Sequence, residues 1–390
     1  MTKTSFLLTT GISGTVQDGP TPGKVYVPLN GHSTKTVKKK ALVVPGTCIA
    51  EHPDASVGDR HAPIAGAVAD VTEQCIIIEP APDAPADDPK APVPPAPPAP
   101  IAVKGLDGDA LRKALKALGV DLCAVPTDNT LVVNGMNPEP GVTVAEQMLT
   151  DGRDTLEAGL AVVRKLVPGV KVVLAVAEGN AATLSDTSVT HVKPVYPNSC
   201  DALVVAAATG KERAPGVGVM SVMQLYAIGR VAETGLPLID TLVSVNGITY
   251  RVPIGTPVGD VLTHAKAEAA TGDTIFANGP MRGEAVSSLD TGVHPGLFAL
   301  GIVSAGSFPP VADHQCINCG ECILACPARI RPNMITRYSE FKLFDKTKGE
   351  GIDACFECGL CGFYCTARRP MLQYIRLAKK VLAACAAKEA

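Results

Sequence analysis

The sequence predicts a multidomain fold in which a β-rich N-terminal part, an α/β middle part and a helical C-terminal part follow one another. Three observations support this prediction. A Pro/Ala-rich segment covers residues 79–100, short aliphatic runs alternate with amphipathic stretches after it, and eight of the 13 cysteines lie between residues 316 and 365. The length of 390 residues is enough for about two to four domains.

Composition and charge exclude several classes of protein. Apolar residues make up 46% of the chain, aromatic residues make up 4%, and tryptophan is absent, so small aliphatic side chains must form most of the cores. The net charge of −3 argues against a nucleic-acid-binding surface. No apolar run reaches the roughly 18 residues that a transmembrane helix needs, and Phe6–Leu8 is too short for a signal peptide. We expect no transmembrane span and a reducing, cytoplasmic compartment.

Residues 1–78 carry the signals of a small β domain. Short β-branched runs are separated by turns with Gly and Pro, as in strands joined by tight hairpins. Residues 57–68 (VGDRHAPIAGAV) have the pattern of a lipoyl-like barrel-sandwich hybrid domain, without the lysine that would carry a swinging cofactor. We therefore expect a passive scaffold. The predicted strands are Val25–Pro28, Ala41–Val44, Ile64–Val71 and Cys75–Ile78.

Residues 79–100 (EPAPDAPADDPKAPVPPAPPAP) form the predicted boundary of this domain. The segment has no apolar face to bury, and its prolines cannot donate backbone hydrogen bonds. It therefore favours an extended, semi-rigid linker with polyproline character. A spacer explains this composition better than a PxxP ligand does.

Residues 101–235 predict an α/β domain, because amphipathic helical patterns alternate with short aliphatic strands. A long helix over Val144–Leu166 is the most extensive of these patterns. The other predicted elements are a helix over Asp109–Leu118, strands over Thr130–Val133 and Lys171–Ala177, and a helix over Ser221–Thr234.

Residues 236–305 predict a β-grasp module of the soluble-ligand-binding type. Asn246-Gly247 lies between two apolar runs, which is a strong signal for a β-hairpin. Thr256 and Pro257 are suited to the N-cap and first position of a helix that runs to about Ala270. The predicted strands are Leu238–Val245, Ile248–Ile254 and Thr274–Ala277.

Two cysteine runs of equal spacing lie in residues 306–390. Each has three cysteines at two-residue spacing and a fourth after three further residues. In two-cluster ferredoxins such a fourth cysteine binds the other cluster. The spacing therefore predicts two [4Fe–4S] clusters in a helical, ferredoxin-like domain. Cluster 1 would be held by Cys316, Cys319, Cys322 and Cys365, and cluster 2 by Cys355, Cys358, Cys361 and Cys326.

Zinc and disulfides are the alternatives for these cysteines. Zinc sites favour separated C-x-x-C pairs, and cysteines three apart bridge poorly in a chain without an export signal. The remaining cysteines are scattered among apolar residues and are interpreted as small buried side chains. They are Cys48, Cys75, Cys123, Cys200 and Cys385.

Basic residues are concentrated in two places. Residues 35–40 (KTVKKK) are interpreted as a solvated β-edge that blocks edge-to-edge association, with a docking patch for an acidic partner such as a ferredoxin or cytochrome as the alternative. Lys and Arg also surround the cysteine runs, where cations stabilise reduced clusters. The helix predicted over residues 370–387 should cover the clusters with Leu372, Ile375, Leu377, Val381 and Leu382, while Arg376, Lys379 and Lys380 face away.

Taken together in their order along the chain, these predicted domains and the cysteine runs resemble the C subunit of Rnf-type electron-transport complexes. They are also similar to the cobalamin reductases of bacterial microcompartments. The resemblance covers nearly the whole chain apart from the proline-rich linker. It is carried by residues 131–140 (LVVNGMNPEP), 254–260 (IGTPVGD), 278–283 (NGPMRG) and the cysteine runs. It implies that the α/β domain is related to the flavin-binding subunit of NADH dehydrogenases, with FMN and NADH as cofactors.

The nucleotide-binding elements of that family are incomplete in this chain. Residues 103–110 (VKGLDGDA) lack the consecutive glycines of the family's phosphate loop and place acidic residues where a phosphate would arrive. Residues 196–201 (YPNSCD) lack the glycines and lysine of a second loop. A third element survives, and the resemblance assigns flavin or nucleotide contacts there to Asn134, Gly135, Glu139 and Pro140. We expect a degenerate flavin/NADH-dehydrogenase-like domain kept as scaffold, with electrons arriving from another protein.

One position in the cysteine runs also departs from the family. Proline normally follows the fourth cysteine, as in Cys326-Pro327, but Thr366 follows Cys365 here. We expect a looser loop at this position and unchanged ligation.

The resemblance implies an electron-transfer subunit of an ion-translocating oxidoreductase complex, peripheral on the cytoplasmic side of the inner membrane. Its partners would be the other subunits of the complex and a ferredoxin, flavoprotein or cytochrome. The alternatives are a flavin/iron–sulfur reductase that oxidises NADH, including a cobalamin-reductase-like enzyme, and an assembly scaffold.

Overall fold

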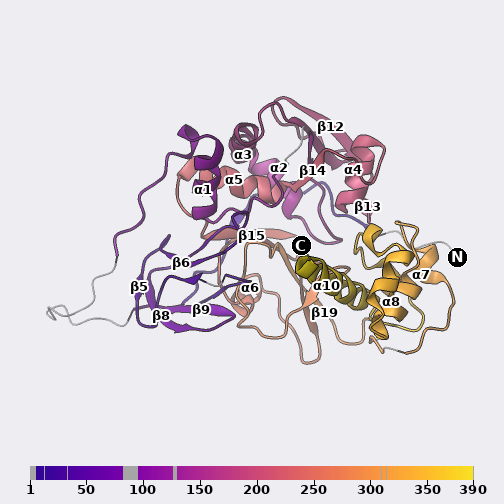
Figure 1. Ribbon diagram of the computed structural model, residues 1–390. Helices are drawn as coiled ribbons and strands as arrows, with labels where there is room; N and C mark the ends of the chain where they lie inside the picture. Colours follow the sequence, from indigo (N-terminus) through magenta and orange to yellow (C-terminus); the bar gives the residue numbers. More distant parts are fainter. Residues whose placement is uncertain are drawn as a thin grey trace. The chain divides into compact units, whose positions relative to one another are not determined.

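The computed structural model describes residues 6–12, 14–32, 34–81, 95–125, 130–308, 310–312 and 314–389. Residues 82–94 of the predicted linker lie outside this range. The chain divides into two compact units, one formed by Met1–Glu268 with Ala285–Gly301 and the other by Ala269–Glu284 with Ile302–Ala390 (Figure 1). Each unit is described by itself below.

The N-terminal part of the first unit consists of two small antiparallel sheets. One has the strand order β3-β9-β8-β5 and the other has the order β4-β6-β7. Alternate side chains of the strands point into a shared apolar core that includes Val25, Val27, Ile49 and Ile76. The strands are β3 (Val25–Pro28), β4 (Thr34–Lys35), β5 (Leu42–Val43), β6 (Cys48–Glu51), β7 (Arg60–His61), β8 (Gly66–Val71) and β9 (Cys75–Glu79).

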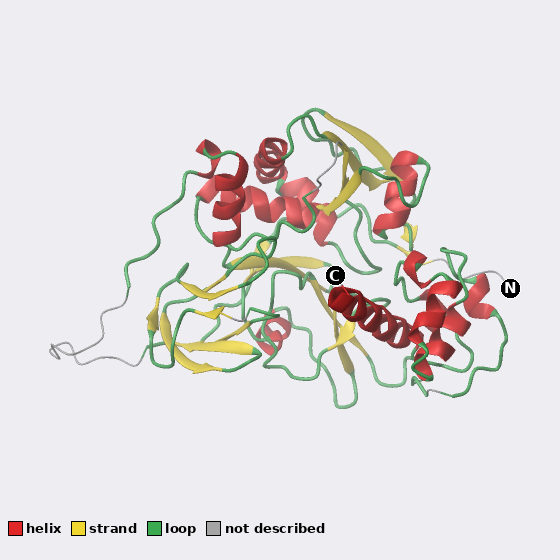
Figure 2. Ribbon diagram, viewed as in Figure 1, coloured by secondary structure: helices red, strands yellow, loops and turns green. Residues whose placement is uncertain are grey.

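The α/β part of the first unit contains a parallel sheet with the strand order β12-β11-β10-β14. Its largest core cluster joins buried side chains of the sheet to helices α1, α2, α3 and α5, and these helices lie near one another in Figure 2. The strands are β10 (Thr130–Asn134), β11 (Lys171–Ala177), β12 (Thr187–Val192) and β14 (Val217–Ser221), with β13 (Val195–Tyr196) outside the sheet. The helices are α1 (Gly108–Ala117), α2 (Val144–Asp151), α3 (Arg153–Leu166), α4 (Asp201–Thr209) and α5 (Val222–Thr234).

The long helix predicted over residues 144–166 is wrong, because the chain forms the separate helices α2 and α3. They meet at Gly152. A Cβ atom there would lie 2.7 Å from the Tyr226 ring and 2.8 Å from the Met148 carbonyl oxygen. The chain therefore changes direction at a residue without a side chain, which lets α5 approach closely.

The predicted hairpin is present as β15 (Asp240–Val245) and β16 (Ile248–Pro253), with Val245 opposite Ile248. The turn residues Asn246 and Gly247 have φ values of 51° and 81°, as a type I′ turn requires. The following helix, α6 (Val258–His264), is shorter than predicted. It ends before Lys266, whose φ of 54° is left-handed, so the helix cannot continue to residue 270.

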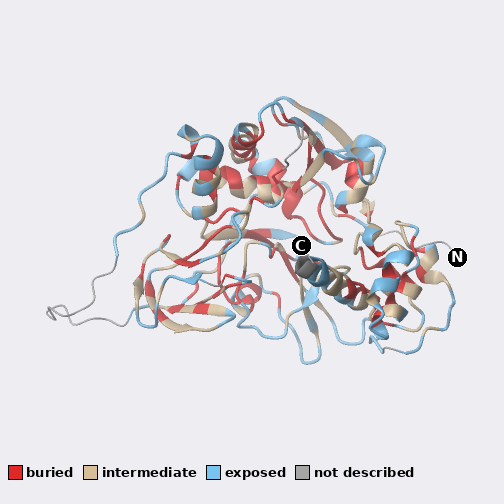
Figure 3. Ribbon diagram, viewed as in Figure 1, coloured by how far each residue is buried: buried red, intermediate tan, exposed pale blue. Residues whose placement is uncertain are grey.

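The second unit is built mainly from short helices around a small apolar core. Ile335, Ile352 and Ile375 are buried in it beside several of the cysteines, and Figure 3 shows the buried inner faces of these helices. The helical elements are α7 (Glu321–Leu324), α8 (Pro332–Glu340), η2 (Phe344–Glu350), η3 (Ile352–Ala354), α9 (Leu360–Phe363) and α10 (Met371–Glu389), and the unit also contains the strand β17 (Thr274–Ala277). Among the described helices of the whole chain, none combines the length and apolar character that a membrane crossing requires.

Candidate iron–sulfur site

Four cysteines from both runs surround a first cavity. Three of them come from the loop before α7 and its first turn, and the fourth follows α9. The structure thus brings together the set predicted for cluster 1. The lining cysteines are Cys316, Cys319, Cys322 and Cys365.

A second cavity is surrounded by the complementary set. Its fourth cysteine comes from the end of the first run, so the two runs exchange their last cysteine. Ile330, Leu372 and Ile375 close the cavity with apolar side chains. The lining cysteines are Cys355, Cys358, Cys361 and Cys326.

The two runs have the same backbone path, displaced by 39 residues in the sequence. Left-handed φ values occur at Asn318 and Glu357 (55° and 57°), at Gly320 and Gly359 (82° and 77°), and at Arg329 and Arg368 (57° and 49°). A left-handed residue between the first two cysteines and another before the third turn each loop around its cavity. At Gly359 a Cβ atom would lie 2.1 Å from the Met281 carbonyl oxygen, so this turn needs glycine for space as well as for its φ.

Burial and neighbouring sulfurs oppose ionisation of the cysteines in the absence of a cation. Burial, followed by interactions with Cys316, Cys365 and Cys319, raises the pKa of Cys322 to about 11. The pKa of Cys361 lies well above its ordinary value, because of burial and then of Cys358, Cys355 and Cys326, with a further contribution from Cys322. Thiolates packed in this way require bound cations. Cys322 and Cys361 belong to the same buried core cluster, so the two cavities are neighbours.

The donor set has the chemistry that iron–sulfur clusters require. Cubane clusters are held by four thiolates, and each cavity is lined by four cysteines. Across the parts of the chain that the structure describes, no three His, Cys, Asp or Glu side chains are grouped so that they could hold a metal ion. The sulfurs are instead distributed around the walls of the two cavities.

Hydrogen-bond donors are concentrated beside the first cavity. The Thr366 hydroxyl oxygen lies 3.1 Å from Cys319 Sγ, and this contact is the main cause of a lowered pKa at Cys319. The backbone N–H of Arg369 donates to Cys365 Sγ at 3.4 Å. Arg369 lines the cavity, is 3% exposed, and has a buried Nε without a partner among the described residues. A donor of this kind suits an anionic group in the cavity.

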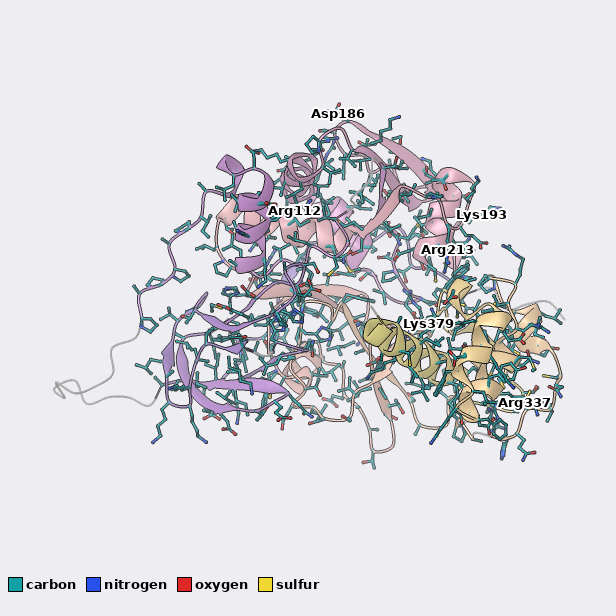
Figure 4. All side chains as sticks on the ribbon, in the orientation of Figure 1. Arg112, Asp186, Lys193, Arg213, Arg337 and Lys379 are labelled. Atoms are coloured by element: carbon teal, nitrogen blue, oxygen red, sulfur yellow. The ribbon has the colours of Figure 1, made fainter. Side chains whose placement is uncertain are left out.

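Two cations and a carboxylate lie beside the second cavity. Glu357, which lines the cavity, pairs with Lys379 at 2.8 Å and Arg376 at 3.2 Å. Burial would raise the pKa of Glu357, but the hydrogen bonds and charges of Lys379 and Arg376 lower it. Lys379 (labelled in Figure 4) also donates to the Cys355 carbonyl oxygen at 2.8 Å.

The prediction for the faces of the last helix is therefore partly wrong. Leu372 and Ile375 line the second cavity as expected, but Leu377 is 46% exposed. Arg376 and Lys379 turn toward the cysteine loop, because Glu357 supplies a partner there. The apolar pattern of the helix alone does not reveal this carboxylate.

The five scattered cysteines are less buried than expected. Cys200 is buried, Cys48 and Cys75 are half-buried, and Cys123 and Cys385 are exposed. Cys385 lies near the end of α10 and Cys123 after α1, where small side chains reach the surface. None of the five lines either cysteine cavity.

The residues assigned to flavin or nucleotide contacts are engaged with the protein itself. The Asn134 amide donates to the Ser199 carbonyl oxygen at 2.9 Å and to Asp201 at 2.8 Å. The Gly135 N–H donates to the Ala175 carbonyl oxygen at 2.8 Å. Glu139 is 0% exposed, and Pro140 is half-buried beside it. This element therefore contacts residues 196–201 through Asn134.

The first nucleotide element, residues 103–110, lies elsewhere in the same unit. Lys165 near the end of α3 donates to the Lys104 carbonyl oxygen at 2.6 Å and pairs with Asp107 at 3.4 Å. In Figure 1 the start of α1 and strand β13 are at opposite sides of this unit. The structure therefore brings together two of the three nucleotide elements and separates the first from them.

The sequence did not reveal that an N-terminal segment crosses the carboxyl ends of the parallel strands. β1 (Phe6–Leu7) pairs with β13, which follows β12. The Thr9 carbonyl oxygen accepts from Asn137 after β10 at 2.9 Å, and the Gly11 N–H donates to Glu146 on α2 at 2.9 Å. Open α/β sheets bind their ligands at this edge. Residues 6–11 therefore lie where a nucleotide would be expected.

Comparisons with known proteins relate most of the chain to one group of sequences. It is 25% identical to the C subunit of the ion-translocating oxidoreductase complex of Rhodobacter capsulatus over 363 residues, covering 81% of this chain and 70% of that protein. It is 24% identical to the C subunit of the proton-translocating ferredoxin:NAD(+) oxidoreductase complex of Clostridium ljungdahlii, covering 93% and 89%. The C subunit of the Na(+)-translocating ferredoxin:NAD(+) oxidoreductase complex of Acetobacterium woodii is 26% identical, covering 94% and 92%. No protein-family model matches the chain.

Among solved structures, the chain is similar to part of an NAD+-reducing [NiFe]-hydrogenase. The air-oxidized form gives a TM-score of 0.38 at 16% identity, and the H2-reduced form gives 0.42 at 15% identity. The similarity covers 66% and 65% of this chain, but the chain spans only 48% and 57% of those two chains.

Proposed function

We propose that this chain, a homologue of the C subunits of ion-translocating oxidoreductase complexes, is an electron-transfer subunit that passes single electrons through two [4Fe–4S] clusters. The observation that carries the proposal is the pair of four-cysteine cavities with an exchanged fourth cysteine. The curated relatives have the same type of complex in their names. Cluster 1 would be held by Cys316, Cys319, Cys322 and Cys365, and cluster 2 by Cys355, Cys358, Cys361 and Cys326.

Neighbouring cavities support transfer from one cluster to the other. Cys322 lines the first cavity and Cys361 lines the second, and both belong to one buried core cluster. Clusters bound there would supply one-electron redox chemistry. The protein positions the sulfurs, shields the second cavity with Ile375 and Leu372, and places hydrogen-bond donors beside the first.

We further propose that electrons enter from another protein and not from NADH bound to this chain. The separated 103–110 loop, the internally bonded Asn134 and the N-terminal segment at the strand ends support this proposal. The donor or acceptor would be a ferredoxin, flavoprotein or cytochrome, or another subunit of the same complex. The chain would then be peripheral on the cytoplasmic side of the membrane that holds the complex.

A second candidate is a flavin/iron–sulfur reductase that oxidises NADH, including a cobalamin-reductase-like enzyme. The observation that favours it is the preserved contact between two of the expected nucleotide elements, through Asn134 and Ser199. In this case FMN would be bound near Glu139 and Pro140 after displacement of the N-terminal segment.

Anaerobic reconstitution of the full chain tests the proposal. We expect about eight iron and eight sulfide atoms per chain, a broad absorption band that dithionite bleaches, and no flavin after acid release. NADH should leave the band unchanged. Iron far below this value would contradict the cluster assignment, whereas bleaching by stoichiometric NADH would favour the second candidate.

A further inference from the structure

The two cysteine runs differ at two corresponding positions beside their cavities. The 39-residue displacement that relates Cys316 to Cys355 also relates Pro327 to Thr366 and Ile330 to Arg369. Pro327 and Ile330 line the second cavity without a polar side chain. Thr366 contacts a sulfur of the first cavity, and Arg369 lines that cavity. The similar loops thus give one cavity two polar groups that the other lacks.

The chemistry of a bound thiolate fixes the direction of the Thr366 contact. A sulfur bound to iron carries no proton, so at 3.1 Å from Cys319 Sγ the Thr366 hydroxyl must be the donor. Arg369 also lines this cavity, and its buried Nε has no protein acceptor among the described residues, so it is available as a second donor. Both groups add to the backbone N–H of Arg369, which donates to Cys365 Sγ.

Ion pairs lie beside both cavities. Arg369 pairs with Glu340 at 2.7 Å beside the first cavity. Beside the second, Glu357 pairs with Lys379, and Arg376 pairs with both Glu357 and Glu284. The backbone N–H of Arg369 donates to Cys365 Sγ beside the first cavity, and the backbone N–H of Glu357 donates to Cys355 Sγ beside the second. The Thr366 hydroxyl and the Arg369 Nε have no counterpart at the corresponding positions of the second cavity.

Exposure acts in the same direction. Cys319 of the first cavity is exposed, whereas Cys358 and Cys361 of the second are buried. Hydrogen bonds to the sulfurs and access of solvent set the reduction potential of iron–sulfur clusters. Both stabilise the additional negative charge of a reduced cluster.

We propose that the Thr366 hydroxyl, assisted by Arg369, gives the site of Cys316, Cys319, Cys322 and Cys365 a higher reduction potential than the site of Cys355, Cys358, Cys361 and Cys326. This inference rests on the proposed two-cluster function. The first electron taken up by the chain then resides at the site beside Thr366, and transfer from the second cavity to the first is energetically favoured. Thr366 is a positioning residue that acts through the Cys319 sulfur.

The test compares Thr366→Val, which removes the hydroxyl at nearly constant volume, with Thr366→Ser, which keeps it. The midpoint potential of each cluster is measured by EPR on the reconstituted full chain at poised potentials. We expect Thr366→Val to lower one midpoint, with about a tenfold change in the reduction equilibrium or about 59 mV, and to leave the other unchanged. Thr366→Ser should keep the native value.

The signal is assigned with Cys319→Ser, which should perturb the same cluster that Thr366→Val shifts. The inference is overturned if both clusters assemble and Thr366→Val shifts neither midpoint, or shifts the cluster that Cys319→Ser spares. It is also overturned if the native site beside Thr366 has the lower midpoint. Native protein that assembles no clusters would instead contradict the proposed function.

A second measurement tests the inference if the Thr366→Val variant fails to assemble the cluster beside position 366. Proton hyperfine spectroscopy of the native reduced protein should show a strong exchangeable coupling at the Thr366 site that disappears in D2O, and the smaller variant Thr366→Ala should lack it. An unchanged coupling in Thr366→Ala would overturn the inference.

Discussion

The Asn137 side chain joins the N-terminal segment to the start of α2, because its amide donates to the Thr9 carbonyl oxygen at 2.9 Å while its oxygen accepts from Ala145 and Glu146. Asn137→Ala should therefore leave buried donors of the first helical turn without acceptors. We expect a loss of about 2 kcal/mol in the free energy of unfolding, measured by urea denaturation. Asn198→Ala removes an exposed bond to the Lys193 carbonyl oxygen and should cost less than half as much. Equal effects of the two changes would contradict this role of Asn137.

The exchanged fourth cysteines predict a crossed pattern of cluster loss. Cys365→Ser should abolish the same EPR signal as Cys319→Ser, although 46 residues separate the two positions, because both line the first cavity. Cys326→Ser should abolish the other signal, since Cys326 lines the second cavity. Each variant should fall from about eight to about four iron atoms per chain.

Cys385→Ser is the matched control for these variants, because Cys385 is exposed on α10 and lines neither cavity. Its iron content should equal that of the native chain. If Cys365→Ser and Cys358→Ser instead left the same signal, each run would be binding its own cluster.

Gly359 should tolerate no side chain. Its φ of 77° is left-handed, and a Cβ atom would lie 2.1 Å from the Met281 carbonyl oxygen. We expect Gly359→Ala to cost about 3 kcal/mol of stability and to lower the occupancy of the second cluster in iron assays. Gly349→Ala is the control, since a Cβ there meets nothing within 4 Å. Similar losses in both variants would mean that neither space nor backbone conformation limits position 359.

His61 should make stability depend on pH. Burial lowers the pKa of His61 from 6.5 to about 4. Below pH 6.5 the unfolded chain therefore binds a proton at His61 that the folded chain does not bind. Stability should therefore fall as the pH decreases from 7 toward 4, by about 2 kcal/mol at pH 5. Urea unfolding at pH 7 and pH 5, followed by circular dichroism, measures this difference.

His61→Gln should flatten the dependence, and the exposed His191→Gln should leave it unchanged. A native pH dependence that His61→Gln does not reduce would contradict the assignment. His32, whose pKa burial also lowers, contributes in the same direction and would account for a remaining slope.

The grouping of the cysteines could be predicted because it depends on local spacing. Cys316, Cys319 and Cys322 lie within seven residues, so one tight loop brings them together. The prediction that Cys365 completes their set follows from the offset of the fourth cysteine, and the cavity has that composition. The hairpin at Asn246-Gly247 was predictable for a similar reason, since its two left-handed residues are adjacent in sequence.

Features that depend on distant partners were not predictable. The break between α2 and α3 is imposed by Tyr226, which packs where a side chain at Gly152 would lie. Arg376 and Lys379 form ion pairs with Glu357, which the apolar pattern of the helix does not indicate. The path of the N-terminal segment depends on bonds between its backbone and side chains more than 100 residues away. Thr366 appeared in the sequence only as a missing proline, and its contact with Cys319 depends on the fold.

The shared backbone path of the two cysteine runs has a consequence for assembly. Each run contributes three cysteines to one cavity and one cysteine to the other, so neither run can complete a cavity by itself. Local unfolding of either run therefore removes sulfur from both sites and should release both clusters together, whereas the loss of a single cysteine affects only the cluster that this cysteine binds.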